Sequence, residues 1–217
     1  AGEMSEEEFL NFLTDNMIKT IHDLGADNIA AFIAEPIMGA GGIIVPPDGY
    51  HKKMRDITKE NEIMYIADEV VTAFGRLGHM FSSEDKYNMI PDIICTAKGL
   101  TSGYQPLSAT IISDDIFEVI SEPGAYFLHG MTYSGHPAAS AAALANIEIL
   151  EKEKIPQKVQ STGKLFEDLL KGLIDLDIVG EVRGSHFMMG IEFVKNKKTK
   201  ETYHDDLAVG QKVANEC

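Results

Sequence analysis

The sequence predicts an α/β fold in which a mostly parallel sheet is flanked by helices. Two short apolar runs, residues 63–67 and 93–97, have the length and β-branched content of buried strands. Segments with a helical repeat of apolar residues alternate with these runs, as is typical of parallel sheets. Asp68 and Lys98 directly follow the two runs. Because ligands bind beyond the carboxyl ends of such strands, we expect both side chains to face one site.

The N-terminal part is expected to form a helix, a strand, a helix and the strand before Asp68. Ser5 precedes three glutamates, which predicts a helix N-cap with an acidic first turn, and Gly25 is expected to end this helix. The continuous apolar run at residues 29–34 predicts a strand. Residues 50–61 predict the second helix, which leads into the strand that ends at Asp68.

The remaining elements are expected to complete one domain and begin another. Residues 107–112 predict a strand, followed by a helix capped by Ser113 or Asp114, and Pro137 fits the first turn of an alanine-rich helix. That helix is small and apolar on most faces, as expected of one buried against other elements or a second subunit. A boundary near residues 152–156 predicts a partial large domain over residues 1–155 and a partial small domain over residues 156–217. In the small domain we expect a helix at 158–174, a strand at 187–194 and a helix at 205–217.

Composition excludes several classes of function. The formal net charge of −15 argues against binding to nucleic acid or to an anionic membrane surface, since both call for basic patches. No apolar run approaches the roughly 20 residues that cross a bilayer. Cys95 and Cys217 form no disulfide framework, which favours a reducing compartment, and we expect the cytoplasm. The histidines lack metal-ligand spacing, so no metal site is expected.

For both Lys98 and Asp68, the alternative to a functional role is an ordinary structural or surface role. A single lysine is most often a solvated surface residue, and a single aspartate is most often a helix cap or a structural carboxylate. Lys98, however, follows a buried run, and Gly99 and Gly103 would allow close approach of the backbone to a ligand. A partly desolvated lysine can form a Schiff base with a carbonyl compound. A carboxylate opposite a pyridine nitrogen would keep that nitrogen protonated.

Six motifs together resemble one family, the class III pyridoxal 5′-phosphate-dependent aminotransferases of fold type I. They are AFIAEPIMGAGG, VPPDGY, YIADEVVTAFGRLG, PDIICTAKGLTSGYQPLSA, HGMTYSGHPAASAAALANIEIL and VGEVRGSHFMMGIEF. They cover nearly the whole chain in the order and approximate spacing of the family. Within it, the chain is most similar to the ω-amine:pyruvate branch. The family's N-terminal phosphate loop and cofactor-stacking aromatic residue are not found before residue 29, and we expect the chain to be an internal portion of a longer polypeptide.

The resemblance implies a role for each of four residues. Lys98 corresponds to the lysine that binds the cofactor covalently and then moves the substrate proton. Asp68 corresponds to the carboxylate that pairs with the pyridine nitrogen, and Val70 to the apolar residue that packs on one face of the ring. Thr132 corresponds to a threonine that binds the cofactor phosphate of the neighbouring subunit, which implies a homodimer with shared active sites. Without the motifs, Val70 would be read as a core residue and Thr132 as a turn hydroxyl.

Glu35 and Arg183 are the implied substrate-binding pair. In several members of the family, the corresponding residues form a salt bridge that controls binding of the substrate carboxylate. Taken alone, either residue would be read as a structural ion-pair partner.

The resemblance implies transamination between a primary amine or ω-amino acid and a keto acid such as pyruvate. An aminomutase or a decarboxylase of the same fold uses the same lysine and carboxylate, so those residues do not distinguish the three reactions. A non-catalytic truncated fragment is the alternative from another class.

Overall fold

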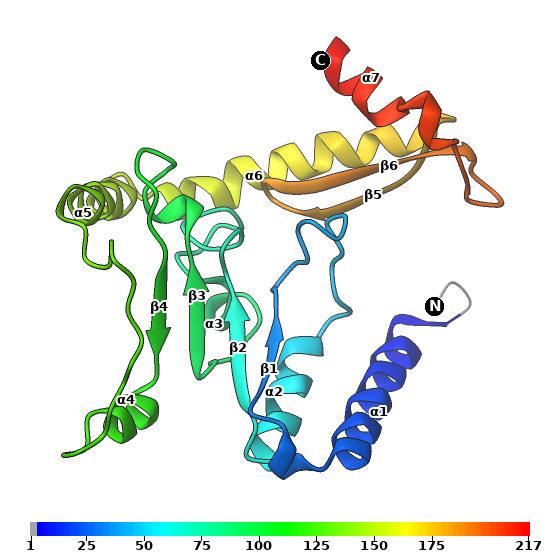
Figure 1. Cartoon of the computed structure of the whole chain (residues 1–217). Coiled ribbons are helices and arrows are strands. Elements are labelled where there is room, and N and C mark those ends of the chain that lie inside the picture. Colours follow the sequence, from blue (N-terminus) through cyan, green and yellow to red (C-terminus); the bar gives the residue numbers. More distant parts are fainter. Residues whose placement is uncertain (1–3) are drawn as a thin grey trace.

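The computed structural model describes residues 4–217 (Figure 1). The N-terminal elements are α1 (Glu6–Leu24), η1 (Ala26–Asn28), β1 (Ala31–Ala34), α2 (Tyr50–Glu60), β2 (Met64–Asp68), α3 (Ser82–Asp85), β3 (Ile93–Thr96), η2 (Lys98–Leu100), β4 (Ala109–Ile112), α4 (Asp114–Ile120) and α5 (Pro137–Lys152). The C-terminal elements are α6 (Ile155–Lys171), η3 (Gly172–Asp175), β5 (Val179–Ser185), β6 (Met188–Asn196), β7 (Glu201–Thr202), η4 (Asp205–Leu207) and α7 (Val209–Glu216). Among residues 4–217, no helix has both the length and the apolar composition needed to cross a membrane.

The first sheet has four strands in the order β1-β2-β3-β4. The first three are parallel, and β4 pairs antiparallel to β3. Ile66 in β2 lies opposite Ile33 in β1 and Ile93 in β3, and Asp68 lies opposite Cys95. The prediction of a mostly parallel sheet flanked by helices is therefore confirmed.

The first helix begins as its sequence predicts. The Ser5 side chain accepts a hydrogen bond from the Glu8 N–H, and the Glu8 carboxylate accepts one from the Ser5 N–H, which completes a capping box. Gly25 ends the helix with a φ of +79°. Ser113 is the N-cap residue of α4, as predicted, but its buried hydroxyl makes no hydrogen bond to the first turn or to any other group among residues 4–217.

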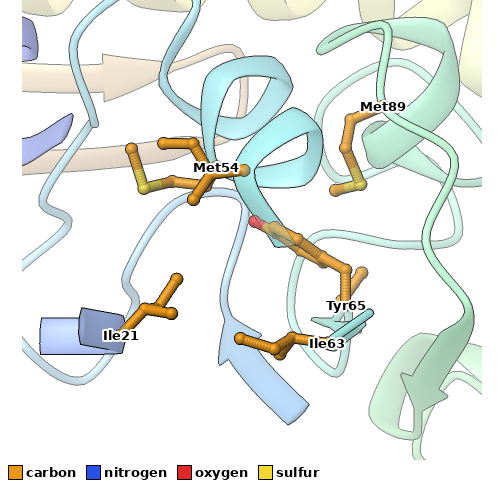
Figure 2. Close-up of a cluster of buried hydrophobic side chains, with 7 residues drawn as sticks. Ile21, Met54, Ile63, Tyr65 and Met89 are labelled. Atoms are coloured by element: carbon orange, nitrogen blue, oxygen red, sulfur yellow. The ribbon is translucent and has the colours of Figure 1, made fainter. Parts of the chain in front are cut away.

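One face of the sheet is covered by α1 and α2. Seven buried side chains form this core: Ile21, Met54, Ile57, Ile63, Tyr65, Ala67 and Met89. Figure 2 shows Tyr65 at the centre of the cluster, with its hydroxyl directed toward α2. On α2, His51 Nε2–H donates to the Pro36 carbonyl (2.9 Å), so that Nδ1 accepts from the Tyr65 hydroxyl (2.8 Å). Burial lowers the pKa of His51, which keeps this buried ring neutral.

The opposite face of the sheet is more open. Met64, Ile66 and Asp68 alternate with the buried residues of β2 and point to this second face. The side chains of Ile33 and Met64 there are 58% and 43% exposed. Asp68 thus lies on the accessible face of the sheet, while its chain neighbours Ala67 and Glu69 are buried.

The second sheet has the order β5-β6-β7 and lies along α6 (Figure 1). The sequence patterns predict β6 but miss β5, whose seven residues pair antiparallel with β6. Helix α6 also starts earlier than predicted, at Ile155, and passes into the 3-10 helix η3 at Gly172.

Glu167 lies on α6 and is 7% exposed where this helix meets the turn between β5 and β6. Its Oε1 accepts hydrogen bonds from Lys171 Nζ (2.5 Å) and Lys164 Nζ (3.2 Å), and its Oε2 accepts one from the His186 N–H (3.2 Å). Burial is the largest single effect and raises the pKa of Glu167. The three hydrogen bonds together outweigh burial and lower the pKa to about 2.

Glu167→Gln is expected to lower the free energy of unfolding by about 2 kcal/mol at neutral pH, because charge-assisted hydrogen bonds are lost. The pKa is depressed in the folded state, so the stabilisation is complete above the ordinary value of 4.5 and is lost as the pH falls toward about 2. Urea unfolding at a series of pH values measures this dependence. Asp168→Asn is the matched control, since exposed Asp168 also pairs with Lys164 (3.0 Å) and should contribute little. A difference for Glu167→Gln that does not change with pH would contradict the assignment.

Candidate active site

Asp68 and Lys98 lie at the carboxyl ends of two adjacent parallel strands. Asp68 is the last residue of β2, and Lys98 follows β3 as the first residue of η2. The Lys98 side chain is exposed, and its backbone has a φ of +38°, in the left-handed region that non-glycine residues rarely adopt. Gly103 follows with a φ of +78°. Backbone strain of this kind clusters at functional sites.

The Asp68 carboxylate has one oxygen occupied within the chain. Its Oδ1 accepts a hydrogen bond from the Val70 N–H (3.1 Å), and no ion pair within residues 4–217 involves Asp68. Cys95 lies opposite Asp68 in the β2–β3 register. Burial raises the pKa of the Cys95 thiol, and the negative charge of Asp68 raises it further. The carboxylate therefore lies on the same face as the thiol and close enough to influence it.

Asp68→Asn is expected to lower the pKa of Cys95, because the nearby negative charge is removed. A lower pKa means a larger thiolate fraction, so Cys95 should react faster with a thiol-modifying reagent at mildly alkaline pH. Mass spectrometry of the labelled peptides measures the rate, with the exposed Cys217 as the internal reference. An unchanged Cys95 rate would show that the carboxylate does not act on the thiol.

Asp68 and Lys98 border different hollows in the described chain. Asp68 lines a cavity of about 530 Å³ together with Glu35, His51 and residues of α1 and β1. Lys98 lines a smaller hollow of about 220 Å³ with Val71 and Phe74 and residues of α6. The two side chains share a sheet edge, as predicted. That one aromatic ring lies between them stays a prediction.

Val70 and Thr132 occupy different environments. Val70 is half-buried in the turn after β2, and its N–H is bonded to Asp68. Thr132 is exposed in the long connection between α4 and α5. No hydrogen bond in the described part of the chain joins Thr132 to the other candidate residues, so its predicted role depends on a neighbouring subunit.

No ion pair joins Glu35 to Arg183 within residues 4–217, and their role in substrate binding stays a prediction. Glu35 Oε2 accepts a hydrogen bond from the Gly39 N–H (2.9 Å). The Arg183 guanidinium donates to the Gly42 carbonyl through Nε (2.7 Å) and pairs with two other acids, Glu181 and Glu192. The physical reason is proximity, since Glu181 and Glu192 lie on the same β5–β6 hairpin as Arg183.

One residue of this region was missed in the sequence, namely Glu69. Its carboxylate is fully buried on the covered face of the sheet and accepts hydrogen bonds from Thr72, Ser82 and Ser83. A signal was present in the alternation of β2, because Tyr65, Ala67 and Glu69 follow one another on the face that packs against α2. An acid in that register must find donors inside the protein.

The mostly parallel sheet flanked by helices is the fold of the pyridoxal phosphate-dependent transferases of fold type I. The family model described as Aminotransferase class-III matches residues 3–214. The chain belongs to this family of aminotransferases.

Two curated relatives and one solved structure illustrate the similarity. The chain is 47% identical over 205 residues to putrescine–pyruvate aminotransferase of Pseudomonas aeruginosa, covering 94% of this chain and 44% of the relative. It is 43% identical to vanillin aminotransferase of Capsicum annuum, covering 98% of this chain and 47% of that protein. The structure of an (S)-enantioselective ω-transaminase from Thermomicrobium roseum superposes with a TM-score of 0.92 at 41% identity, covering 96% of this chain and 46% of the other. The chain spans less than half the length of these relatives.

Proposed function

We propose that the native protein carrying this sequence transfers an amino group between a primary amine or ω-amino acid and a keto acid such as pyruvate. The observation that carries the proposal is the strand-end pair of Lys98 and Asp68 in a member of the class III aminotransferase family. The similar protein from Pseudomonas aeruginosa, named a putrescine–pyruvate aminotransferase, supports an amine such as putrescine as donor and pyruvate as acceptor.

The residues at the sheet edge fit pyridoxal phosphate, on which class III aminotransferases depend. Asp68 Oδ2 makes no hydrogen bond within residues 4–217, so it can accept one from a pyridinium N–H. Lys98 presents an exposed primary amine, and Gly99 and Gly103 follow it in the chain. When bound, the cofactor supplies an electron sink for the charge that develops on the substrate carbon.

Each candidate residue then has one task. Lys98 Nζ would hold the cofactor covalently, and the same amine, once released, would move the proton of the substrate carbon that carries the nitrogen. Asp68 would keep the pyridine nitrogen protonated, and Val70 would cover one face of the ring. Glu35 and Arg183 are proposed to contact the substrate carboxylate, for which Arg183 would have to exchange its present acidic partners.

We further propose a homodimer in which Thr132 binds the cofactor phosphate of the neighbouring subunit. The segment around Thr132 carries large apolar side chains that are exposed in the isolated chain, including Tyr126 and Leu128 at 89% and 92%. Helix α5, expected to be buried, also exposes Leu144. Large exposed apolar side chains that are concentrated in one part of the chain are typical of an interface. Sedimentation equilibrium of the native protein tests the dimer, and Leu128→Glu should shift it toward monomer.

The domain division and the cellular location belong to the same proposal. Residues 1–155 would contribute to a cofactor-binding large domain and residues 156–217 to a small domain, in keeping with a separate sheet on each side of Ile155. A cytoplasmic location agrees with two cysteines that are free in the structure.

The test is an assay of the native protein with pyridoxal phosphate, putrescine and pyruvate. Alanine formation that requires both the amine and pyruvate is the expected result. Release of carbon dioxide, or rearrangement of an amino acid without consumption of pyruvate, would instead identify a decarboxylase or an aminomutase. A protein that stays colourless and inactive after incubation with the cofactor would identify a non-catalytic form.

A further inference from the structure

The buried carboxylate of Glu69 holds together two segments that are distant along the chain. Its Oε2 accepts from Thr72 Oγ1 (3.0 Å) and from the Ser82 N–H (2.8 Å). Its Oε1 accepts from the Ser83 N–H (2.7 Å) and from the Ser83 hydroxyl. The side chain is 0% exposed, and no cation lies within ion-pair distance among residues 4–217.

A buried carboxylate is costly to desolvate, even when hydrogen-bonded. An apolar side chain in its place would leave the buried N–H groups of Ser82 and Ser83 without acceptors, so the carboxylate fixes the position of this segment. Its four bonds close residues 69–83 into a loop. Two backbone bonds support the closure, from the Phe74 N–H to the Met80 carbonyl and from the Gly75 N–H to the His79 carbonyl, both 2.8 Å.

Phe74 in the closed loop packs against the backbone of Gly99, the residue after Lys98. A Cβ atom placed on Gly99 would lie 2.9 Å from the Cβ of Phe74, so only glycine permits this approach. Glu69 is also tied to the strand that leads to Lys98, since its N–H donates to the Cys95 carbonyl (2.9 Å). Lys98, with its left-handed φ, therefore lies between two residues that contact residues 69–83, Cys95 before it and Gly99 after it.

We propose that Glu69 is a positioning residue for the site. Through the closed loop and Phe74 it holds the backbone of Lys98, and through the peptide bond it holds Asp68 on the opposite face of the sheet. The catalytic meaning of this inference rests on the proposed function, whereas the coupling between the loop and Lys98 is a property of the chain itself.

Hydrogen exchange of the native protein tests the coupling. Glu69→Gln replaces two acceptor sites by an amide N–H₂ group that faces backbone donors, so the loop should open more often. We expect exchange on the order of tenfold faster at the amides of residues 82–83 and also of residues 100–102. Faster exchange at residues 82–83 alone, with residues 100–102 as in the wild type, would overturn the proposal.

The matched control is Asp92→Asn. Asp92 is a partly buried carboxylate at the other end of the sheet, where it binds Arg55 (2.6 and 2.7 Å) and the Tyr65 N–H (2.7 Å). This variant should lose stability without a local change at residues 100–102. An equal change in both variants would mean that exchange reports global stability, which would also overturn the proposal.

Phe74→Ala provides a second variant in case Glu69→Gln does not fold. It removes the contact with Gly99 but leaves the buried carboxylate and its donors intact. Exchange should accelerate at residues 100–102 while residues 82–83 stay protected. Unchanged exchange at residues 100–102 would contradict the coupling.

The effect of Glu69 on Lys98 itself is measured by chemical labelling. The native protein is treated with pyridoxal phosphate and borohydride, and labelled peptides are quantified by mass spectrometry. Glu69→Gln should reduce labelling at Lys98 several-fold and leave labelling at the exposed Lys53 unchanged. If the wild-type chain shows no preference for Lys98, the proposed function loses support, and hydrogen exchange still decides the coupling.

Discussion

Lys98→Ala is expected to abolish transamination by the native protein, with a loss of about 10⁴-fold or more. The amine of Lys98 is assigned two tasks that no neighbouring group can take over. It binds the cofactor covalently, and it carries the proton between two carbon atoms. Among residues 4–217, the pocket lined by Lys98 contains one other basic side chain, Arg76, whose guanidinium does not form an imine.

Two measurements check this prediction separately. Turnover is followed as alanine formed from pyruvate, and cofactor attachment is followed by borohydride labelling of the peptide that contains Lys98. Lys53→Ala on the exposed face of α2 is the matched control and should retain both. Lys98→Arg should fail like the alanine variant, because a guanidinium keeps the charge but does not form an imine. Activity close to that of the wild type in Lys98→Ala would refute the proposed function.

Asp68→Asn is expected to lower the rate of transamination on the order of 10²-fold or more. The amide has nearly the shape of the carboxylate and can still accept from the Val70 N–H. It lacks the negative charge that keeps a proton on the pyridine nitrogen, so the ring becomes a weaker electron sink. The loss should therefore appear in kcat more than in the KM of the amine.

The comparison with Asp68→Glu tests whether charge is the cause. Glutamate restores the negative charge with a longer side chain, and part of the lost rate should return. Binding of the cofactor, measured by absorbance, should change less than turnover in both variants. An asparagine variant as active as the wild type would show that Asp68 only supports the turn after β2.

Local sequence patterns predicted much of the first sheet. The acidic first turn after Ser5, the helix near Tyr50 and the run before Asp68 all match the structure within a few residues. The local sequence is sufficient to predict these elements, since periodicity, caps and apolar runs act within a few residues of one another. Strand β5 was missed because Glu181 and Arg183 interrupt any apolar run, and its hydrogen bonds come from pairing with β6.

In the candidate site, too, the sequence predicted some features and not others. Lys98 and Asp68 were found because each directly follows an apolar run, and parallel pairing of β2 with β3 then brings both to one edge. The substrate-binding role of Glu35 and Arg183 stays a prediction. The sequence did not indicate which acids lie nearest to the Arg183 guanidinium on the β5–β6 hairpin, and these are Glu181 and Glu192.

From its sequence alone, this protein was assigned an α/β architecture, a family and a reactive lysine. Those properties depend on short-range patterns and on motifs that can be recognised in the amino-acid sequence. The tertiary structure alone decided which face of the sheet is open, which hollow each side chain borders, and that Glu69 closes a loop against the backbone of Lys98. These are contacts between residues far apart along the chain, and their geometry is set only when strands pair and side chains are packed together.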